Sequence, residues 1–167
     1  MRGQSLLQAA ASLVCGFVVW WLIAGALPTP LAATSLSVRL GLGAASLLPA
    51  AVVLAAMIVA QMAARFWFGT FDPTAGRDGR FLRINQRVIT NSVEQLAILV
   101  PAMLALVAEA SPLRMPQVLA LPLVFALARL VFWAGYLVTP ILRGSGMATS
   151  FAATLCALVW AIAVWVF

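Results

Sequence analysis

The chain carries the sequence PQVLALPLVFALARLVFWAGYLV at residues 116–138, an apolar stretch whose single charged side chain is Arg129. A helix needs ~20 such residues to cross the hydrocarbon core of a bilayer. Apolar runs of similar length lie at residues 6–27, 40–64, 81–108 and 147–167. The run at 81–108 differs from the others because its first half is polar and amphipathic. These runs predict five membrane-spanning helices.

The composition indicates a membrane protein rather than a soluble domain. Of the 167 residues, 65% are hydrophobic and 8% are charged, and the mean hydropathy is +1.10. Soluble globular chains are only about half apolar, so the excess predicts surface that faces lipid. We therefore interpret the chain as an all-α integral membrane protein.

The residue types that are missing exclude several kinds of chemistry. All ten basic residues are arginine, so there is no histidine to serve as a base or metal ligand and no lysine to form a Schiff base. Cys15 and Cys156 lie far apart in apolar runs and form no metal or redox motif. We expect no bound metal. We also expect no nucleic-acid partner, because the arginines are scattered among membrane segments.

The first apolar run is separated from the others by a linker that contains two prolines. We assign residues 1–40 to an amino-terminal transmembrane helix with its linker, and residues 41–167 to a four-helix membrane domain. The first run also resembles a signal peptide, since the small residues 24–26 could form a cleavage site. Its length and the interfacial residues Trp20 and Trp21 favour a retained helix. Cleavage would leave four helices with the same loops on the same side.

The arginines at the ends of the spans predict the orientation in the membrane. Five spans place the amino terminus, the loop at 65–83 and the loop at 139–147 on one side. That side holds Arg2, Arg65, Arg77, Arg80, Arg83 and Arg143, and the other side holds Arg39 and Arg114. We expect the arginine-rich side to be cytoplasmic, with the amino terminus inside and the carboxyl terminus outside. In a bacterium this multi-pass protein would lie in the inner membrane.

Two lines of polar residues lie at membrane depth, where such side chains are costly and mark functional sites by default. One line, on the run at 81–108 and just before it, follows helical spacing and contains Arg80, Arg87, Asn91 and Glu94. The other, on the next run and just after it, contains Arg129, Tyr136, Pro140 and Arg143. Together they predict an electropositive pocket near the cytoplasmic interface that suits an anionic ligand.

Glu94 and Arg129 are expected to neutralise each other, because each is the most deeply placed charge of its span. Two interpretations of this pair stay open. It can be a purely structural ion pair that fixes helix register, or part of a functional site. A small transporter that uses the two residues as a relay is a further alternative.

The polar residues resemble a motif of the membrane-associated proteins in eicosanoid and glutathione metabolism, the MAPEG family. The family signature Arg-Ala-His-x-Asn-x-x-Glu is similar to residues 87–94, which keep Arg87, Asn91 and Glu94. The next family helix carries an Arg seven residues before a Tyr, followed by a loop with Pro and Arg. Arg129, Tyr136, Pro140 and Arg143 occur here in that order. The resemblance covers about residues 42–167.

The resemblance implies a four-helix transmembrane bundle that assembles as a homotrimer and binds glutathione, as co-substrate, between subunits. Arg87, Asn91, Glu94 and Arg129 would form the glutathione site, and Arg65 would reach a carboxylate although no motif specifies it. Tyr136 and Arg143 would be catalytic, with Arg143 stabilising the thiolate. The activity implied is that of a glutathione transferase or peroxidase in detoxification, acting on a lipophilic substrate from membrane lipid.

Two departures from the family pattern bear on activity more than on fold. Ile89 stands where the signature has His, and no Tyr follows Arg143, where Gly144, Ser145, Gly146 and Met147 come next. A protein that keeps the fold but has lost the chemistry, and binds lipid or a partner, is therefore an alternative function. The first helix would be an addition to the four-helix core.

Overall fold

The computed structural model describes residues 2–31 and 33–166, which are almost entirely helical. Five helices are long and apolar enough to cross a membrane, as the apolar runs predict. They are α1 (Arg2–Ala26), α2 (Leu36–Phe68), α3 (Arg80–Glu109), α4 (Met115–Leu137) and α5 (Pro140–Val166), and two short 3-10 turns, Pro73–Ala75 and Pro112–Arg114, precede α3 and α4. The expectation of an all-α membrane protein is confirmed.

Helix α2 is longer than its apolar run because both of its ends are capped. Its first turn is capped by Ser35, whose Oγ accepts a hydrogen bond from the Val38 N–H at 3.4 Å. It ends at Gly69, whose φ of 64° is readily adopted only by glycine. The 33 residues of α2 extend ~50 Å, more than the ~30 Å hydrocarbon core of a bilayer.

Helix α5 begins seven residues earlier than its predicted apolar run at 147–167, whose last residue lies outside the described part of the chain. The predicted loop at 139–147 is therefore wrong, and the connection between α4 and α5 is a tight turn. Proline is favoured in the first turn of a helix, so Pro140 starts α5 instead of interrupting it. The Leu142 N–H donates to Thr139 Oγ1 at 3.4 Å at the same turn. As a result, Arg143 lies in the first turn of α5 and not in a loop.

Helix α4 is the centre of the molecule and packs against each of the other four helices. Its apolar side chains meet those of α2, α3 and α5 in one core, which includes Leu99, Met103, Leu106, Val118 and Phe125. The backbones of α4 and α5 approach closely at Gly135 and Gly146. A Cβ on Gly146 would lie 2.3 Å from the Phe132 nitrogen, so this contact admits only glycine.

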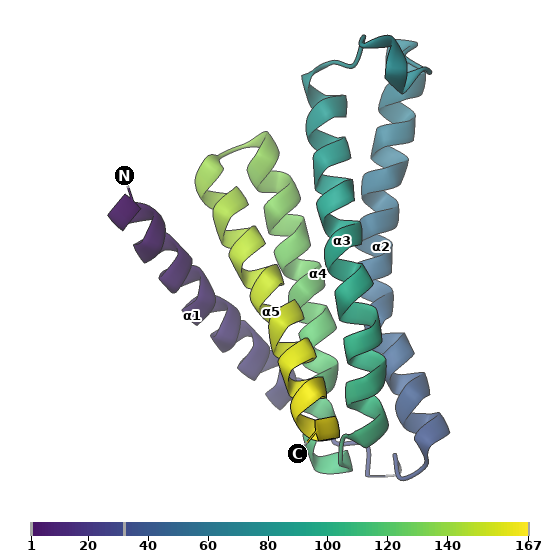
Figure 1. Cartoon of the computed structure of the whole chain (residues 1–167), viewed down its shortest axis with the longest axis vertical. Helices are drawn as coiled ribbons and strands as arrows, with labels where there is room; N and C mark the ends of the chain where they lie inside the picture. The colour runs from purple at the N-terminus through teal and green to yellow at the C-terminus, as the bar shows by residue number, and fades with distance from the viewer. Residues whose placement is uncertain (1, 32, 167) are drawn as a thin grey trace.

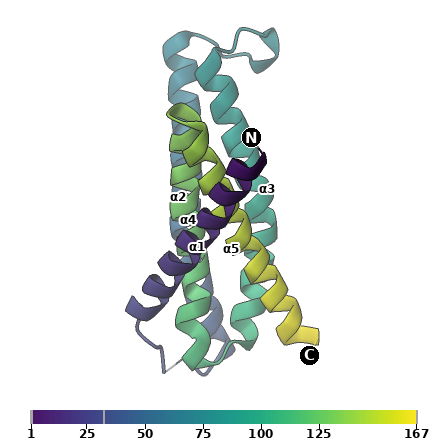
Figure 2. The same cartoon turned by 90° about the vertical axis from the view of Figure 1, so that its left-hand side faces the viewer.

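Helix α1 lies outside this core and contacts only α4 and α5. It crosses them obliquely, as Figures 1 and 2 show. The crossing point is Gly16, where a Cβ would lie 2.7 Å from Thr149 Cγ2. Three hydrogen bonds hold α1 in place. Trp20 Nε1 donates to the Gln117 carbonyl at 2.9 Å, Thr149 Oγ1 donates to the Ser12 carbonyl at 3.1 Å, and Gln8 Nε2 donates to the Ile141 carbonyl.

The start of α1, the α2–α3 loop and the α4–α5 turn share one end of the bundle (Figure 1). We call this the arginine-rich end, because it carries six of the arginines assigned above to one side. The α2–α3 hairpin extends further than the α4–α5 turn at this end (Figure 1). Which side of the membrane this end faces stays a prediction.

Candidate functional site

Arg129 is buried in the middle of the bundle, with 1% of its surface exposed. Helix α4 places it beside α3 and α5, which supply its partners. Its Nη1 donates to Asn91 Oδ1 at 2.8 Å, and its Nη2 donates to Ser150 Oγ at 2.9 Å and points at Met147 Sδ at 3.9 Å. Neutral dipoles from two helices thus solvate a buried cation at membrane depth.

Aromatic rings connect Arg129 to the arginine-rich end. The Arg129 guanidinium lies 4.7 Å from the centre of the Phe132 ring. Phe132 meets Tyr136 edge to face, with ring centres 5.1 Å apart, and the Arg143 guanidinium lies 5.1 Å from the centre of the Tyr136 ring. We call these four residues the arginine–aromatic stack. The structure thus brings together Arg129, Tyr136 and Arg143, as the sequence predicts.

The predicted ion pair between Glu94 and Arg129 is not formed, and this prediction is wrong for the single chain. Glu94 is exposed, and Arg129 is held by Asn91 instead. The physical reason is the rotation of α3: residues 91 and 94 point about 60° apart on a helix, and Asn91 is the one on the side of α4. The relay pair on which a transporter would depend is therefore absent from the described residues.

The remaining charged residues of the predicted site lie on the exposed face of α3 or at the surface. Arg87 and Glu94 are exposed, as are Arg80 and Arg83 one or two turns earlier on the same helix. Arg143 is exposed at the start of α5. Within one chain, Arg87, Glu94 and Arg143 are consequently exposed, whereas Arg129 is buried.

Arg65 takes part in a different interaction. Its Nη1 and Nη2 donate to the two carboxylate oxygens of Asp78 at 3.0 and 2.9 Å, and Nη1 also donates to the Thr70 carbonyl at 3.0 Å. This bidentate pair closes the α2–α3 loop and is the one salt bridge among the side chains that the structure describes. Arg65, in the last turn of α2, is thereby held against the loop and away from the interactions of Arg129.

The other carboxylate of that loop is also engaged. Asp72 Oδ1 accepts hydrogen bonds from the side chain of Thr74 at 2.6 Å and from its backbone N–H at 2.8 Å. These two bonds favour the ionised form and hold the pKa of Asp72 below its ordinary value. Because Arg65 offsets Asp78, the exposed Arg77, Arg80 and Arg83 outnumber the one remaining acid of the loop, Asp72.

Sequence reasoning missed a second polar cluster between α2 and α3. Asn85 Nδ2 donates to the Met57 carbonyl at 2.9 Å and to Gln61 Oε1 at 3.0 Å, and Gln61 Nε2 donates to the Leu82 carbonyl at 3.2 Å. All of these polar groups are buried. Gln61 could have been noticed in the sequence, because it is a polar residue near the end of the apolar run at 40–64. Ser150, which binds Arg129, had no such signal because serine is common in membrane helices.

The arrangement can bind an anion and hold it beside an apolar membrane phase. A buried guanidinium supplies fixed positive charge, and the exposed Arg87 and Arg143 supply donors that match carboxylates. Tyr136 supplies a phenolic hydroxyl within the arginine–aromatic stack. Among the described residues there is no group of three or more acidic, Cys or His side chains that could hold a metal ion.

Comparison with known proteins identifies the family of this chain. A model of the MAPEG family matches residues 40–163, which covers α3 and α4 completely and nearly all of α2 and α5. Neither the curated proteins nor the solved structures gave a match.

Proposed function

Because the chain belongs to the MAPEG family, we propose that it is a membrane-bound glutathione-dependent enzyme that activates the glutathione thiol for attack on lipophilic electrophiles or hydroperoxides. The observation that carries this proposal is the arginine–aromatic stack. It joins a buried cation held by Asn91 to the exposed Arg143 at the end of the bundle. An anionic tripeptide with two carboxylates and a thiol is a ligand of suitable charge and reach.

Glutathione would bind along the exposed face of α3. Arg87, Asn91 and Glu94 would contact its charged and amide groups, with Arg129 as the buried counter-charge and Arg65 as a further candidate for a carboxylate. The exposed face supports a homotrimer as well, because charged side chains at membrane depth must be covered by protein, ligand or water. A neighbouring copy on this face would enclose the site that one chain leaves open.

The chemistry rests on the thiolate. A free thiol has a pKa of ~8.5, so near neutral pH it is mostly protonated and weakly nucleophilic. The Arg143 guanidinium would lower the thiol pKa by its charge and would donate hydrogen bonds to the anion without titrating itself. Tyr136 lies against Arg143 and would orient the sulfur by its hydroxyl. The thiolate would then attack an acceptor that reaches the site from the bilayer.

An ultraviolet difference titration of the detergent-purified protein with glutathione tests this proposal. We expect saturable thiolate absorbance near neutral pH for the wild type, loss of it in Arg143→Ala, and partial return in Arg143→Lys. Arg114→Ala is the matched control, because Arg114 is an exposed arginine at the opposite end. Wild-type absorbance that persists in Arg143→Ala would remove Arg143 from the mechanism.

A non-catalytic member of the family is the second candidate, and one observation favours it. Ile89, at the position of the signature His, packs against the apolar core, so the site lacks a polar group there. The same titration separates the two candidates. Glutathione binding by calorimetry without thiolate absorbance would indicate a catalytically silent relative that has kept the fold.

A further inference from the structure

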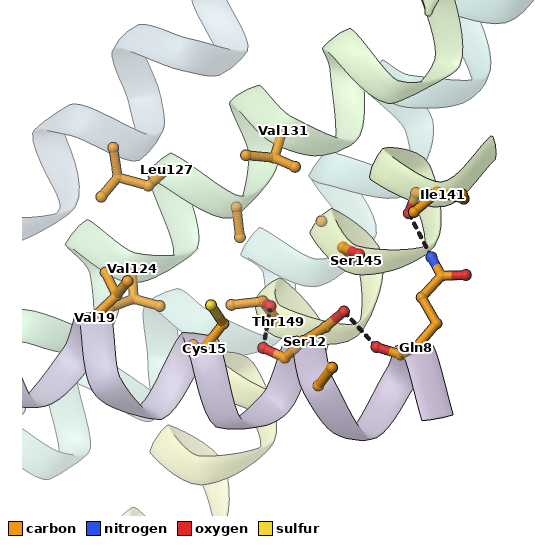
Figure 3. A pocket seen from close by; sticks show the side chains of 14 residues that line it. Gln8, Ser12, Cys15, Val19, Val124, Leu127, Val131, Ile141, Ser145 and Thr149 are labelled. Carbon is orange, nitrogen blue, oxygen red and sulfur yellow. Dashed lines mark hydrogen bonds between the residues drawn. The ribbon is translucent and has the colours of Figure 1, made fainter. Parts of the chain in front are cut away.

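A cavity of about 500 Å³ lies between α1, α4 and α5, on the side of α5 that faces away from Arg129. Figure 3 shows its walls, with Gln8 and Ile141 at one end and Val19 and Val124 at the other. Its volume lies in the range of small-molecule sites, ~300–1,000 Å³. Cys15 and Leu127 of its lining are exposed, so the cavity is open to the surroundings of the helices, which are lipid when the helices span a membrane.

This cavity exists because of α1. Helix α1 precedes the residues matched by the family model, 40–163, and supplies one complete wall through Gln8, Ser12 and Cys15. The crossing of α1 over α5 at Gly16 leaves a wedge of space on each side. The second wedge, of about 730 Å³, is lined by Phe17, Trp20 and Cys156 among others.

The chemistry of the walls specifies the ligand. Most of the lining is apolar, with Val19, Val124, Leu127 and Val131 toward its middle and far end. The hydroxyl groups of Ser12 and Thr149 already donate to backbone carbonyls in the walls. Ser12 Oγ donates to the Gln8 carbonyl, and Thr149 Oγ1 donates to the Ser12 carbonyl. The polar groups nearest the arginine-rich end are the Gln8 amide, which donates to the Ile141 carbonyl, and the Ser145 hydroxyl. The cavity is therefore apolar along its length and polar at one end.

We propose that this cavity binds a single-chain amphiphile of the fatty-acid class, with the hydrocarbon chain between α1, α4 and α5. Its polar group lies at Gln8 and Ser145. A hydrocarbon chain fits the apolar walls, and one chain rather than two fits the volume. The polar end of the cavity lies at the end of the bundle, where the ligand's head group would meet the membrane interface. This site does not depend on the proposed glutathione chemistry.

Substitution of neighbouring alanines on α1 tests the site. Ala11 lines the cavity and Ala10 does not, while both are exposed. Ala11→Phe fills the cavity, and Ala10→Phe adds the same ring on the outer surface. Oleate is titrated into each detergent-purified protein and counted by native mass spectrometry. We expect one saturable oleate in the wild type and in Ala10→Phe, and affinity at least ~10-fold weaker in Ala11→Phe. Equal oleate binding by all three proteins would overturn the proposal.

Helix α4 offers a second matched pair in case a ring on α1 disturbs folding. Leu127 lines the cavity, Leu130 does not, and the two are 48% and 43% exposed. Leu127→Trp should lose the bound oleate, and Leu130→Trp should retain it. Retention of oleate by both tryptophan variants contradicts the site.

The two native cysteines provide an independent readout. Cys15 lines this cavity, and Cys156 lines the second wedge. We expect oleate to slow the alkylation of Cys15 by a membrane-permeant maleimide in a saturable way, and to do so less in Ala11→Phe. Protection of Cys15 and Cys156 to the same degree in the wild type and in Ala11→Phe would indicate general partition into the micelle and would refute the assignment.

Discussion

At the scale of single residues, the main determinant of the site's charge is Arg129, which is buried without a carboxylate partner. A charge at membrane depth is tolerated only where polar groups replace its water shell. Asn91 and Ser150 do this with bonds of 2.8 and 2.9 Å, and the rings of Phe125 and Phe132 lie at 5.3 and 4.7 Å. Because these partners are neutral, the protein keeps a net positive charge in its interior. An anionic ligand can therefore be attracted to the site without displacing an internal acid.

Asn91→Ala should destabilise the fold, because it removes one acceptor and leaves part of the buried guanidinium without a hydrogen bond. Hydrogen bonds to charged groups contribute about 1.5–3 kcal/mol, so we expect a loss of about that size. The measurement is the free energy of unfolding in mixed micelles. Glu94→Gln is the control and should change it by less than ~0.5 kcal/mol, since Glu94 is exposed. A larger loss in Glu94→Gln than in Asn91→Ala would restore Glu94 as the partner of Arg129.

The sequence predicted the polar residues around Arg129 correctly, but it did not predict which of them binds Arg129. The depth of Arg129 and the helical spacing of Asn91 and Glu94 follow from the chain alone. The choice between Asn91 and Glu94 depends on how α3 is rotated relative to α4, which is set by the packing of many apolar side chains. Pairing of opposite charges was the simplest expectation, and the rotation of α3 overrides it.

At the scale of helices, the close packing of α4 against α5 depends on two glycines, which have no side chain. Cβ atoms on Gly135 and Gly146 would lie 2.1 Å from the Arg143 nitrogen and 2.3 Å from the Phe132 nitrogen. This close approach places Arg143 over Tyr136 and Ser150 beside Arg129. The apolar runs predicted the existence of both helices. They did not predict the early start of α5, because residues 140–146 are too polar and too rich in glycine to look like part of a span.

Gly146→Ala should separate α4 from α5 and destabilise the protein by about 1–3 kcal/mol, the usual cost of overpacking a tight contact. Gly41→Ala is the matched control, since a Cβ there has no neighbour within 4 Å. In a helix that substitution should be neutral or stabilising by up to ~1 kcal/mol. Thermal unfolding of both variants checks the pair. Equal stability of the two variants would show that the α4–α5 contact is not tight.

At the scale of the whole molecule, the spacing of the apolar runs predicts the number of membrane spans. It also predicts which loops lie together at each end of the bundle. The extent of the α2–α3 hairpin is not predicted in this way, because α2 continues beyond its apolar run at 40–64 and ends only at Phe68. The path of α1 was equally unpredictable. Gln8, Ser12 and Gly16 recur at four-residue spacing and form the face that meets α5, but this spacing does not specify the angle at which α1 crosses the bundle.

The orientation of the molecule can be tested by the chemical accessibility of its two ends. We expect the arginine-rich end to face the cytoplasm. In a variant with Cys15 and Cys156 replaced by serine, Ala75→Cys marks this end and Ser111→Cys marks the other, and both positions are exposed. A membrane-impermeant maleimide applied to intact cells should label Ser111→Cys and spare Ala75→Cys. The opposite pattern of labelling would reverse the topology.

The α2–α3 hairpin extends past the α4–α5 turn (Figure 1). Arg77 and Arg80 therefore lie farther out at the arginine-rich end than the other helices do. Fixed positive charge in such a position speeds the diffusional encounter with anions, and added salt screens this attraction. Arginine does not lose its proton at ordinary pH. The association rate of an anionic ligand should therefore fall as ionic strength rises and stay nearly constant with pH. The dissociation rate, which depends on short-range contacts within a bound complex, should respond less to salt than the association rate.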